Sequence, residues 1–349
     1  MSRLHDPPST EAAPHLSLSR CALPSRPSLH LICCLILVGV CLSRGNTSQA
    51  PPTYAAQRAA HSPVPLPALT AQAAYLIDAD TNTVLFNQKG EQSIMIASTS
   101  KIMTAYLAVT KVDPTNPVRI APETVTYVKH YIGGSSAGLQ PNDSLTVEDL
   151  LYAMMLPSGN DAAMLIAQAV GITEEGFVAM MNREAGKIGL SKNTHFQNPE
   201  GSSVIRGMPN SYQDNYNTTT AADLVKLSRL AMANPLFATI VKRPDYPLPD
   251  TLSPAAHVPA GTLRHHAYNW LNDNTLLAPL GGYEGATGIK TGANDLAGYS
   301  FAFAATRPIR CTTHLIGVVL QSDSGEHRFT DARALLDYGF STLSAQSSS

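Results

Sequence analysis

The segment STSKIMTAYLAV, residues 98–109, combines the pattern of a buried helix with two reactive side chains. Its apolar residues recur at the spacing of a helix that buries one face, and they are Ile102, Met103, Ala105, Tyr106 and Val109. Ser98 and Lys101 stand one turn apart at the start of this helix, so both side chains can lie on the same face. The lysine amine can then reach the serine hydroxyl, which is a poor nucleophile until a nearby base accepts its proton. The segment therefore predicts a buried helix with an activated serine in its first turn.

Two further motifs follow Ser98-Thr99-Ser100-Lys101 along the chain. Ser158-Gly159-Asn160 comes directly after an expected helix end at Pro157, and Lys290-Thr291-Gly292 lies just before a predicted strand. An S-x-N string also occurs at Ser191, so the second motif alone is not specific, whereas S-x-x-K and K-T-G each occur once. Each motif by itself also fits a structural interpretation: a helix cap, a turn and a polar loop between strands, in that order. The three together, in this order, indicate an acyl-transfer site.

Each residue type suits one task in such a site. Lys101 can act as the base only if burial or nearby positive charge lowers its pKa, and a helix start and a second lysine both act in that direction. The hydroxyl of Ser158 can relay protons, and the amide of Asn160 can hold the carbonyl of an acyl chain. Lys290-Thr291 can hold a carboxylate, and the glycine that follows lets a substrate backbone approach an edge strand.

The composition limits the class of protein. The 349 residues are 44% hydrophobic and 14% charged, which suits a folded domain with a sizeable core. The net charge is −2 and no basic block occurs, so nucleic acid is not expected as a partner. No metal-binding or nucleotide-binding motif is present, so we expect neither a metal nor another cofactor.

The N-terminal region is expected to serve targeting. Residues 31–42 form an apolar run that is short for a membrane span, which needs roughly 20 residues, and that fits the core of a signal peptide. We expect residues 1–45 to be a signal peptide or a retained N-terminal anchor, with neither role as the remaining alternative. Residues 46–70 are interpreted as a Pro/Ala-rich linker, 71–343 as the catalytic domain and 344–349 as a polar tail. The protein is thus expected to be exported and extracytoplasmic, with membrane association only through the N-terminal apolar segment.

The predicted elements place strands at both ends of the chain and helices between them. Two apolar runs flank turn residues and predict a β-hairpin at 74–78 and 83–87. Further strands are predicted at 299–305 and 313–320, before a closing helix at 327–340. The helices of the middle are predicted at 98–109, from a capping box at Thr146 to Pro157, and at 162–169, 174–188 and 221–233. One sheet built from distant parts of the sequence is expected, while the proline-rich stretch 243–267 is interpreted as an irregular excursion.

Longer stretches around the motifs extend the pattern into a family resemblance. They are residues 151–163 (LYAMMLPSGNDAA), Asn198-Pro199-Glu200-Gly201, Ala297-Gly298-Tyr299 and Tyr338-Gly339-Phe340. With the three motifs, they make the chain similar to the serine-type D-alanyl-D-alanine carboxypeptidases, the low-molecular-mass penicillin-binding proteins, from about Ala73 to Ser341. The resemblance implies an α+β fold of the three-layer α/β/α type. In this DD-peptidase/β-lactamase-like fold, helices flank a mainly antiparallel sheet, which is joined to a helical lobe.

The resemblance also implies a role for each site residue. The implied catalytic residues are the nucleophile Ser98, its base Lys101, the proton carriers Ser158 and Lys290, and the substrate-positioning Asn160. The implied substrate-binding residues are Thr291, Gly292, Ala293 and Arg328. Thr291 and Arg328 would hold a terminal carboxylate, and the backbone N–H groups of Ser98 and Ala293 would form the oxyanion hole. A bulkier residue is common in the family at the position of Ala293, so the resemblance implies that the N–H group is kept while the substrate preference is open to change.

The expected function is removal of the terminal D-alanine from peptidoglycan stem pentapeptides through an acyl-enzyme on Ser98. The expected partners are stem peptides that end in D-Ala-D-Ala, and β-lactam antibiotics. One alternative is a β-lactamase, but no E-x-x-L-N string follows Asn160 to hold the deacylating water of class A enzymes. The other alternative is a non-catalytic protein that senses penicillin or binds the cell wall. The intact motifs argue against it.

Overall fold

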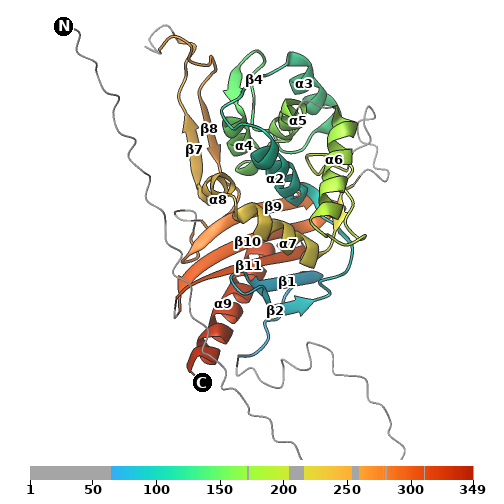
Figure 1. The fold of residues 1–349 in the computed structure, drawn as a ribbon, viewed down its shortest axis with the longest axis vertical. Coiled ribbons are helices and arrows are strands. Elements are labelled where there is room, and N and C mark those ends of the chain that lie inside the picture. Colours follow the sequence, from blue (N-terminus) through green and yellow to red (C-terminus); the bar gives the residue numbers. More distant parts are fainter. Residues whose placement is uncertain are drawn as a thin grey trace, which may run out of the picture. The chain divides into compact units, whose positions relative to one another are not determined.

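An antiparallel sheet of five strands forms the base of the domain (Figure 1). The computed structural model describes residues 64–170, 173–203, 216–253, 259–277, 279, 281–309 and 311–348. The expected signal segment and residues 46–63 of the expected linker lie outside these residues, whereas residues 64–70 are among them. The strand order is β2-β1-β11-β10-β9. The strands are β1 (Ala73–Asp78), β2 (Thr83–Gln88), β9 (Ala286–Asn294), β10 (Gly298–Pro308) and β11 (Thr312–Ser322).

The sheet joins the two ends of the domain, as the sequence predicts. β1 pairs with β11 so that Ala73 lies opposite Leu320 and Asp78 opposite Leu315. β2 returns along β1 as the predicted hairpin. The predicted strands near 299–305 and 313–320 are confirmed as β10 and β11.

The helices lie mostly between the first and last strands of the sheet. They are η1 (Ala97–Ser100), α2 (Lys101–Lys111), α3 (Pro122–Tyr127), η2 (Val128–Ile132), α4 (Val147–Met155), α5 (Asn160–Ala169), α6 (Glu174–Lys187), α7 (Ala221–Met232), α8 (Pro235–Lys242) and α9 (His327–Ser348). Short strands connect them: β3 (Ile94–Met95) pairs with β6 (Thr218–Thr219), β4 (Pro117–Arg119) with β5 (Ser144–Thr146), and β7 (Asp245–Leu248) with β8 (Tyr268–Leu271).

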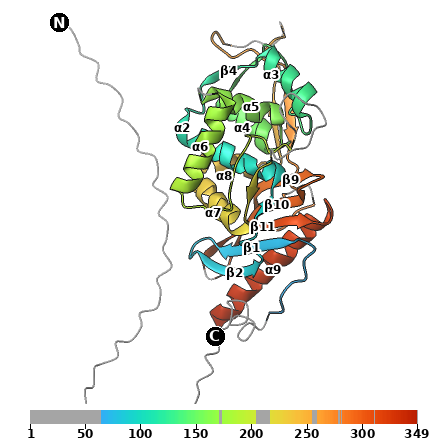
Figure 2. The ribbon, with the colours of Figure 1, turned by 90° about the vertical axis from the view of Figure 1, so that its right-hand side faces the viewer.

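Helices cover both faces of the sheet and give it three layers (Figures 1 and 2). α9 packs on one face, against β11, β10 and β1. α7 packs on the opposite face against β11 and β1, and α8 packs against β9. The expected α+β architecture with a flanked antiparallel sheet is therefore present.

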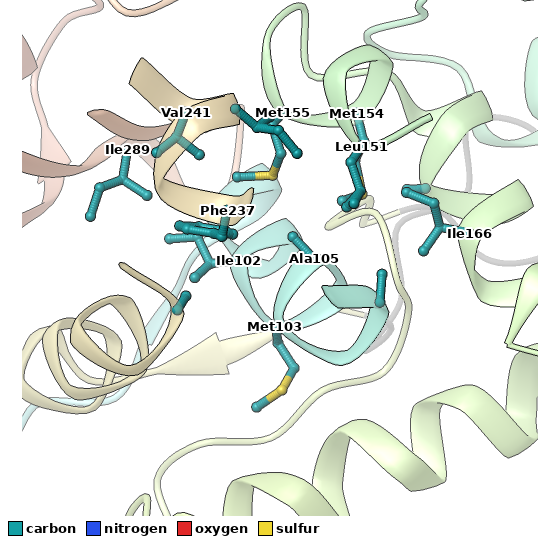
Figure 3. Packing of buried hydrophobic residues seen from close by; sticks show 14 of the residues in the cluster. Ile102, Met103, Ala105, Leu151, Met154, Met155, Ile166, Phe237, Val241 and Ile289 are labelled. Carbon is teal, nitrogen blue, oxygen red and sulfur yellow. The ribbon is translucent and has the colours of Figure 1, made fainter. Parts of the chain in front are cut away.

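α2 is the central helix of the second layer (Figure 3). Figure 3 shows Ile102 beside Phe237 of α8, and Leu151 of α4 and Ile166 of α5 belong to the same buried cluster. Burial of each such side chain contributes roughly 1.5–3 kcal/mol. Because α2 starts at Lys101, this packing fixes the position of the lysine in the second of the three layers.

The start of α4 confirms the predicted capping box. The hydroxyl oxygen of Thr146 accepts from the backbone N–H of Asp149 at 3.0 Å, and the Asp149 carboxylate accepts from the backbone N–H of Thr146 at 2.9 Å. Two backbone donors that a helix start leaves open are thereby satisfied.

Several predicted boundaries differ from the structure. The third motif, placed by the sequence just before a strand, lies inside β9, whose glycines and polar residues hide the alternation that marks a strand. Within the stretch 243–267, Asp245–Leu248 is the strand β7 and pairs with β8, so this part is not irregular. α9 continues past Phe340 to Ser348, since Thr342 and Leu343 still pack against the domain.

In the described part of the chain, no single helix combines the length and apolar character needed to cross a membrane. Two bent pairs of helices, α5 with α6 and α7 with α8, reach that length and composition only when taken together.

Candidate active site

A tight turn presents Ser98. η1 forms this turn, and Ala97 has a φ of +43°, in the left-handed region that residues with a side chain rarely adopt. The hydroxyl of Thr99 donates to the carbonyl oxygen of Ile96 at 2.6 Å and closes the turn from inside. The predicted helix therefore begins as a tighter turn, and α2 itself starts only at Lys101.

Two glycines allow other segments to approach this turn. A Cβ atom at Gly292 of β9 would stand 2.8 Å from the carbonyl oxygen of Ile96. A Cβ atom at Gly201 would overlap the carbonyl group of Ala97. The turn is thus held between the third motif and the loop that contains Gly201, and both positions require glycine.

Lys101 is the centre of the hydrogen bonds in the site. Its Nζ donates to Ser98 Oγ at 2.9 Å, to Asn160 Oδ1 at 2.7 Å and to the backbone carbonyl oxygen of Glu200 at 2.6 Å. An ammonium group has three protons, so these three acceptors satisfy all of them. A neutral amine would donate to Asn160 and Glu200 and keep its lone pair for the hydroxyl proton of Ser98.

Burial lowers the pKa of both lysines in the site. Lys101 is 0% exposed, and this burial together with the positive charge of Lys290 lowers its pKa to about 7. Lys290 is 1% exposed, and its burial, aided by Arg328, lowers its pKa to about 8. Near neutral pH, a substantial fraction of Lys101 is therefore neutral and able to accept a proton.

Asn160 is held from two sides at the start of α5. Its Oδ1 accepts from Lys101, while its Nδ2 donates to the carbonyl oxygen of Gly133 at 2.8 Å. Its backbone N–H donates to the carbonyl oxygen of Ser135 at 2.9 Å. Ser158 precedes it, buried and with a φ of +67°, and in the described part of the chain its hydroxyl makes no hydrogen bond to either lysine.

The third motif brings a second cluster of cations to the edge of the sheet. Lys290 Nζ donates to Thr291 Oγ1 at 3.4 Å, and Arg328 Nη1 donates to the carbonyl oxygen of Gly292 at 3.4 Å. In the part of the chain that the structure describes, Arg328 makes no ion pair, and its buried Nε has no hydrogen-bond partner. A partly buried, unpaired guanidinium beside an edge strand is suited to a carboxylate ligand.

The structure thus brings together most of the residues expected at the site. Ser98, Lys101 and Asn160 are directly hydrogen-bonded, and Arg328 contacts the third motif. Ala293 lies on the same edge strand, opposite Tyr299, and the oxyanion hole expected from its N–H group stays a prediction.

Two groups in the site were not assigned a role from the sequence. The carbonyl oxygen of Glu200 accepts from Lys101, and the sequence of its loop, residues 198–201, indicates only a family resemblance. The carboxylate of Asp161 accepts from Ser136 Oγ at 2.7 Å and from the backbone N–H of Ala137 at 2.9 Å. Its position directly after Asn160 was the available signal. In the part of the chain that the structure describes, no group of three His, Cys, Asp or Glu residues is arranged to hold a metal ion.

Comparison with known sequences identifies related proteins. A family profile described as D-alanyl-D-alanine carboxypeptidase (Peptidase_S11) matches residues 57–324. The D-alanyl-D-alanine carboxypeptidase of Streptomyces sp. strain K15 is 31% identical over 88% of this chain and 96% of its own length. DacB2 of Mycobacterium tuberculosis is 31% identical over 79% of this chain and 84% of its own. DacF of Bacillus subtilis is 28% identical over 78% of this chain, but only 62% of its length is covered.

Solved structures confirm the expected DD-peptidase fold. The DD-transpeptidase of Streptomyces K15 matches with a TM-score of 0.67 and 33% identity, covering 79% of this chain and 99% of that one. Penicillin-binding protein D2 of Listeria monocytogenes, solved in an ampicillin-bound form, matches with a TM-score of 0.60 and 25% identity, covering 79% and 99%.

Proposed function

Because this chain belongs to the D-alanyl-D-alanine carboxypeptidase family, we propose that it is a serine DD-carboxypeptidase that removes the terminal D-alanine from peptidoglycan stem pentapeptides. The observation that carries the proposal is the buried Lys101, whose Nζ lies 2.9 Å from Ser98 Oγ. A fully buried lysine with a pKa of about 7 is a base that works near neutral pH.

In the first half-reaction, Ser98 attacks the carbonyl between the two terminal D-alanines. Neutral Lys101 accepts the hydroxyl proton as the new C–O bond forms. The N–H groups of Ser98 and Ala293 stabilise the oxyanion. The C–N bond then breaks as Ser158 delivers a proton to the departing D-alanine amine, and the proton held by Lys101 passes through Lys290 to Ser158, so that Lys101 is neutral again.

In the second half-reaction, a water molecule attacks the acyl-enzyme and Lys101 accepts its proton. The ester bond breaks, Ser98 regains its proton, and the shortened peptide leaves. Thr291 and Arg328 hold the carboxylate of the terminal D-alanine during the first step. This proposal is supported by the unpaired guanidinium of Arg328, 3.4 Å from the third motif.

The test is the intact mass of the protein after incubation with benzylpenicillin, beside Ser98→Ala, followed by a D-alanine release assay. A stable adduct in the wild type that Ser98→Ala lacks, with D-alanine released only by the wild type, is the expected result. Destruction of penicillin without an adduct would instead indicate a β-lactamase. Binding of a pentapeptide without release of D-alanine would indicate a non-catalytic wall-binding protein.

A DD-transpeptidase is a second candidate, because the Streptomyces K15 structures matched at about one-third identity are described as such. The same acyl-enzyme would then be captured by an amine instead of water. A pentapeptide supplied with an amino-acid acceptor separates the two, since only a transpeptidase forms a new amide in preference to the hydrolysed product.

We also propose that the protein acts outside the cytoplasm, where its substrate is cross-linked. The apolar run at residues 31–42 supports export. N-terminal sequencing of the protein from a cell envelope fraction tests this, because cytoplasmic protein with an intact N-terminus would contradict it.

A further inference from the structure

The antiparallel pair of strands β7 and β8 (Figure 1) is joined to α4 by a stack of aromatic side chains. Tyr246 of β7 stacks on Tyr152 of α4, with ring centroids 3.8 Å apart and ring planes 3° from parallel. Trp270 of β8 lies 6.1 Å from Tyr246, and Tyr268 lies 5.0 Å from Trp270. α4 ends shortly before Ser158, so the stack connects this pair of strands to the helix that leads into the second motif.

Two members of the stack also hold the segment 133–140, here called the wall segment. Trp270 Nε1 donates to the carbonyl oxygen of Ala137 at 2.8 Å. The hydroxyl of Tyr268 accepts from the backbone N–H of Gln140 at 2.9 Å and donates to the carboxylate of Asp143 at 2.5 Å. Trp270 is 4% exposed and Ala137 is 8% exposed, so water cannot readily replace the indole donor.

The wall segment in turn orients Asn160. The carbonyl oxygen of Gly133 accepts from Asn160 Nδ2, and the carbonyl oxygen of Ser135 accepts from its backbone N–H. An amide side chain has its donor and acceptor on opposite sides, so the bond to Gly133 turns Oδ1 toward Lys101. The 2.7 Å bond from Lys101 Nζ to Asn160 Oδ1 therefore depends on the place of the wall segment.

We propose that Trp270 is a positioning residue for acyl transfer: its indole holds the wall segment so that Asn160 keeps Lys101 beside Ser98. This role rests on the proposed function, and it gives the β7–β8 pair a part in the reaction although Trp270 touches none of the reacting atoms. Asp161 also holds the wall segment, because its carboxylate accepts from Ser136 Oγ and from the N–H of Ala137. Three side chains from outside the wall segment thus hold it: Trp270, Tyr268 and Asp161.

The test is the acylation rate with benzylpenicillin in Trp270→Phe, which keeps an aromatic ring in the stack and removes the N–H donor. We expect the rate to fall about tenfold. We also expect the acid limb of its pH profile to move to lower pH. A carbonyl acceptor favours the ammonium form, so a weakened bond to Asn160 lowers the pKa of Lys101 further. A purely structural role for Trp270 would not move this limb.

The matched control is Tyr246→Phe, which keeps the stack and removes the 2.8 Å bond from the Tyr246 hydroxyl to Asp149 Oδ1. That bond ends at the cap of α4 and not at the wall segment, so the acylation rate and pH limb should equal those of the wild type. If both variants lose rate equally, the effect is general loosening and the proposal is wrong. A wild-type rate and limb in folded Trp270→Phe would also contradict it.

If Trp270→Phe does not fold, Tyr268→Phe provides the second reading, because it removes the bond to Gln140 in the same wall segment. Tyr268→Phe should also lower the acylation rate and move the acid limb of its pH profile to lower pH. Wild-type values of both would overturn the proposal. Failure of the proposed function gives a different result, because the wild type itself would then not be acylated on Ser98. In that case the role proposed for Trp270 would also be wrong.

Discussion

The backbone of Gly292 approaches Ile96 so closely that a Cβ atom at position 292 would stand 2.8 Å from the Ile96 carbonyl oxygen and 2.9 Å from the Thr99 nitrogen. This contact places the edge strand of the sheet against the turn that presents Ser98. Gly292 of the third motif therefore helps to set the position of the turn that contains the first motif. A substrate backbone added beside β9 would lie next to the nucleophile for the same reason.

Gly292→Ala should displace this turn and slow acylation by benzylpenicillin about tenfold to a hundredfold, because the backbone atoms of Ile96 and Thr99 leave no room for a methyl group. Stopped-flow or quenched mass measurements of the adduct give the rate. Gly186→Ala is the control, since a Cβ atom there meets nothing within 4 Å and its rate should stay at the wild-type value. An unchanged rate in Gly292→Ala would contradict the close-approach argument.

Lys290→Met should shift the acid limb of the acylation pH profile to higher pH. The positive charge of Lys290 helps to lower the pKa of Lys101, so its removal raises that pKa and protonates the base over a wider acid range. Lys290→Arg keeps the charge and should leave the limb near its wild-type position even where the rate falls. If both variants keep the wild-type limb, the two lysines are not electrostatically coupled.

Stability should depend on pH through Lys101. In the unfolded chain this lysine holds its proton up to about pH 10.5, but in the folded protein it releases it above about pH 7. The unfolded state binds more protons in this window, so stability rises with pH between the two values. The difference in Tm between the wild type and Lys101→Met should therefore change in favour of the wild type, by a few degrees, from about pH 7 to 10. A difference that stays constant across this range would show an unperturbed Lys101.

Arg328→Leu should lower kcat/KM for a peptide that ends in a free carboxylate by about a hundredfold, because a charge-assisted pair is lost. A peptide whose terminal carboxylate is replaced by an amide should lose much less, and this comparison serves as the control. Equal losses on both substrates would place the effect of Arg328 elsewhere, for example on Phe329, whose ring centroid lies 4.8 Å from the guanidinium carbon.

Ile102→Ala should destabilise the domain by about 2–5 kcal/mol, since this side chain is fully buried at the centre of the second layer. Urea unfolding measures the loss. Leu66→Ala is the control, because Leu66 is 59% exposed and its truncation should change stability by less than about 0.5 kcal/mol. A similar loss in both variants would mean that α2 is not the packing centre.

Local features of this chain could be predicted from the sequence because they depend on neighbouring residues. The hairpin at 74–78 and 83–87, the capping box at Thr146 and the S-x-x-K spacing of Ser98 and Lys101 all form between groups close in the chain. Other features escaped prediction because they lack a local pattern. β9 carries glycines and polar side chains, and part of the stretch 243–267 pairs with a strand beyond it. The targeting role of residues 1–45 and the domain boundaries stay predictions.

The amino-acid sequence alone specifies which side chains are available: a serine and a lysine one helical turn apart, an asparagine after a helix end, and a K-T-G string. The pKa of Lys101, and with it the ability of this lysine to act as a base, depends on the tertiary structure. The full burial of Lys101, the charge of Lys290 on the edge strand β9 and the carbonyl oxygen of Glu200 all depend on residues distant in the chain. Removal from water and the approach of distant charges lower the pKa of a lysine, and both arise only when the layers pack together.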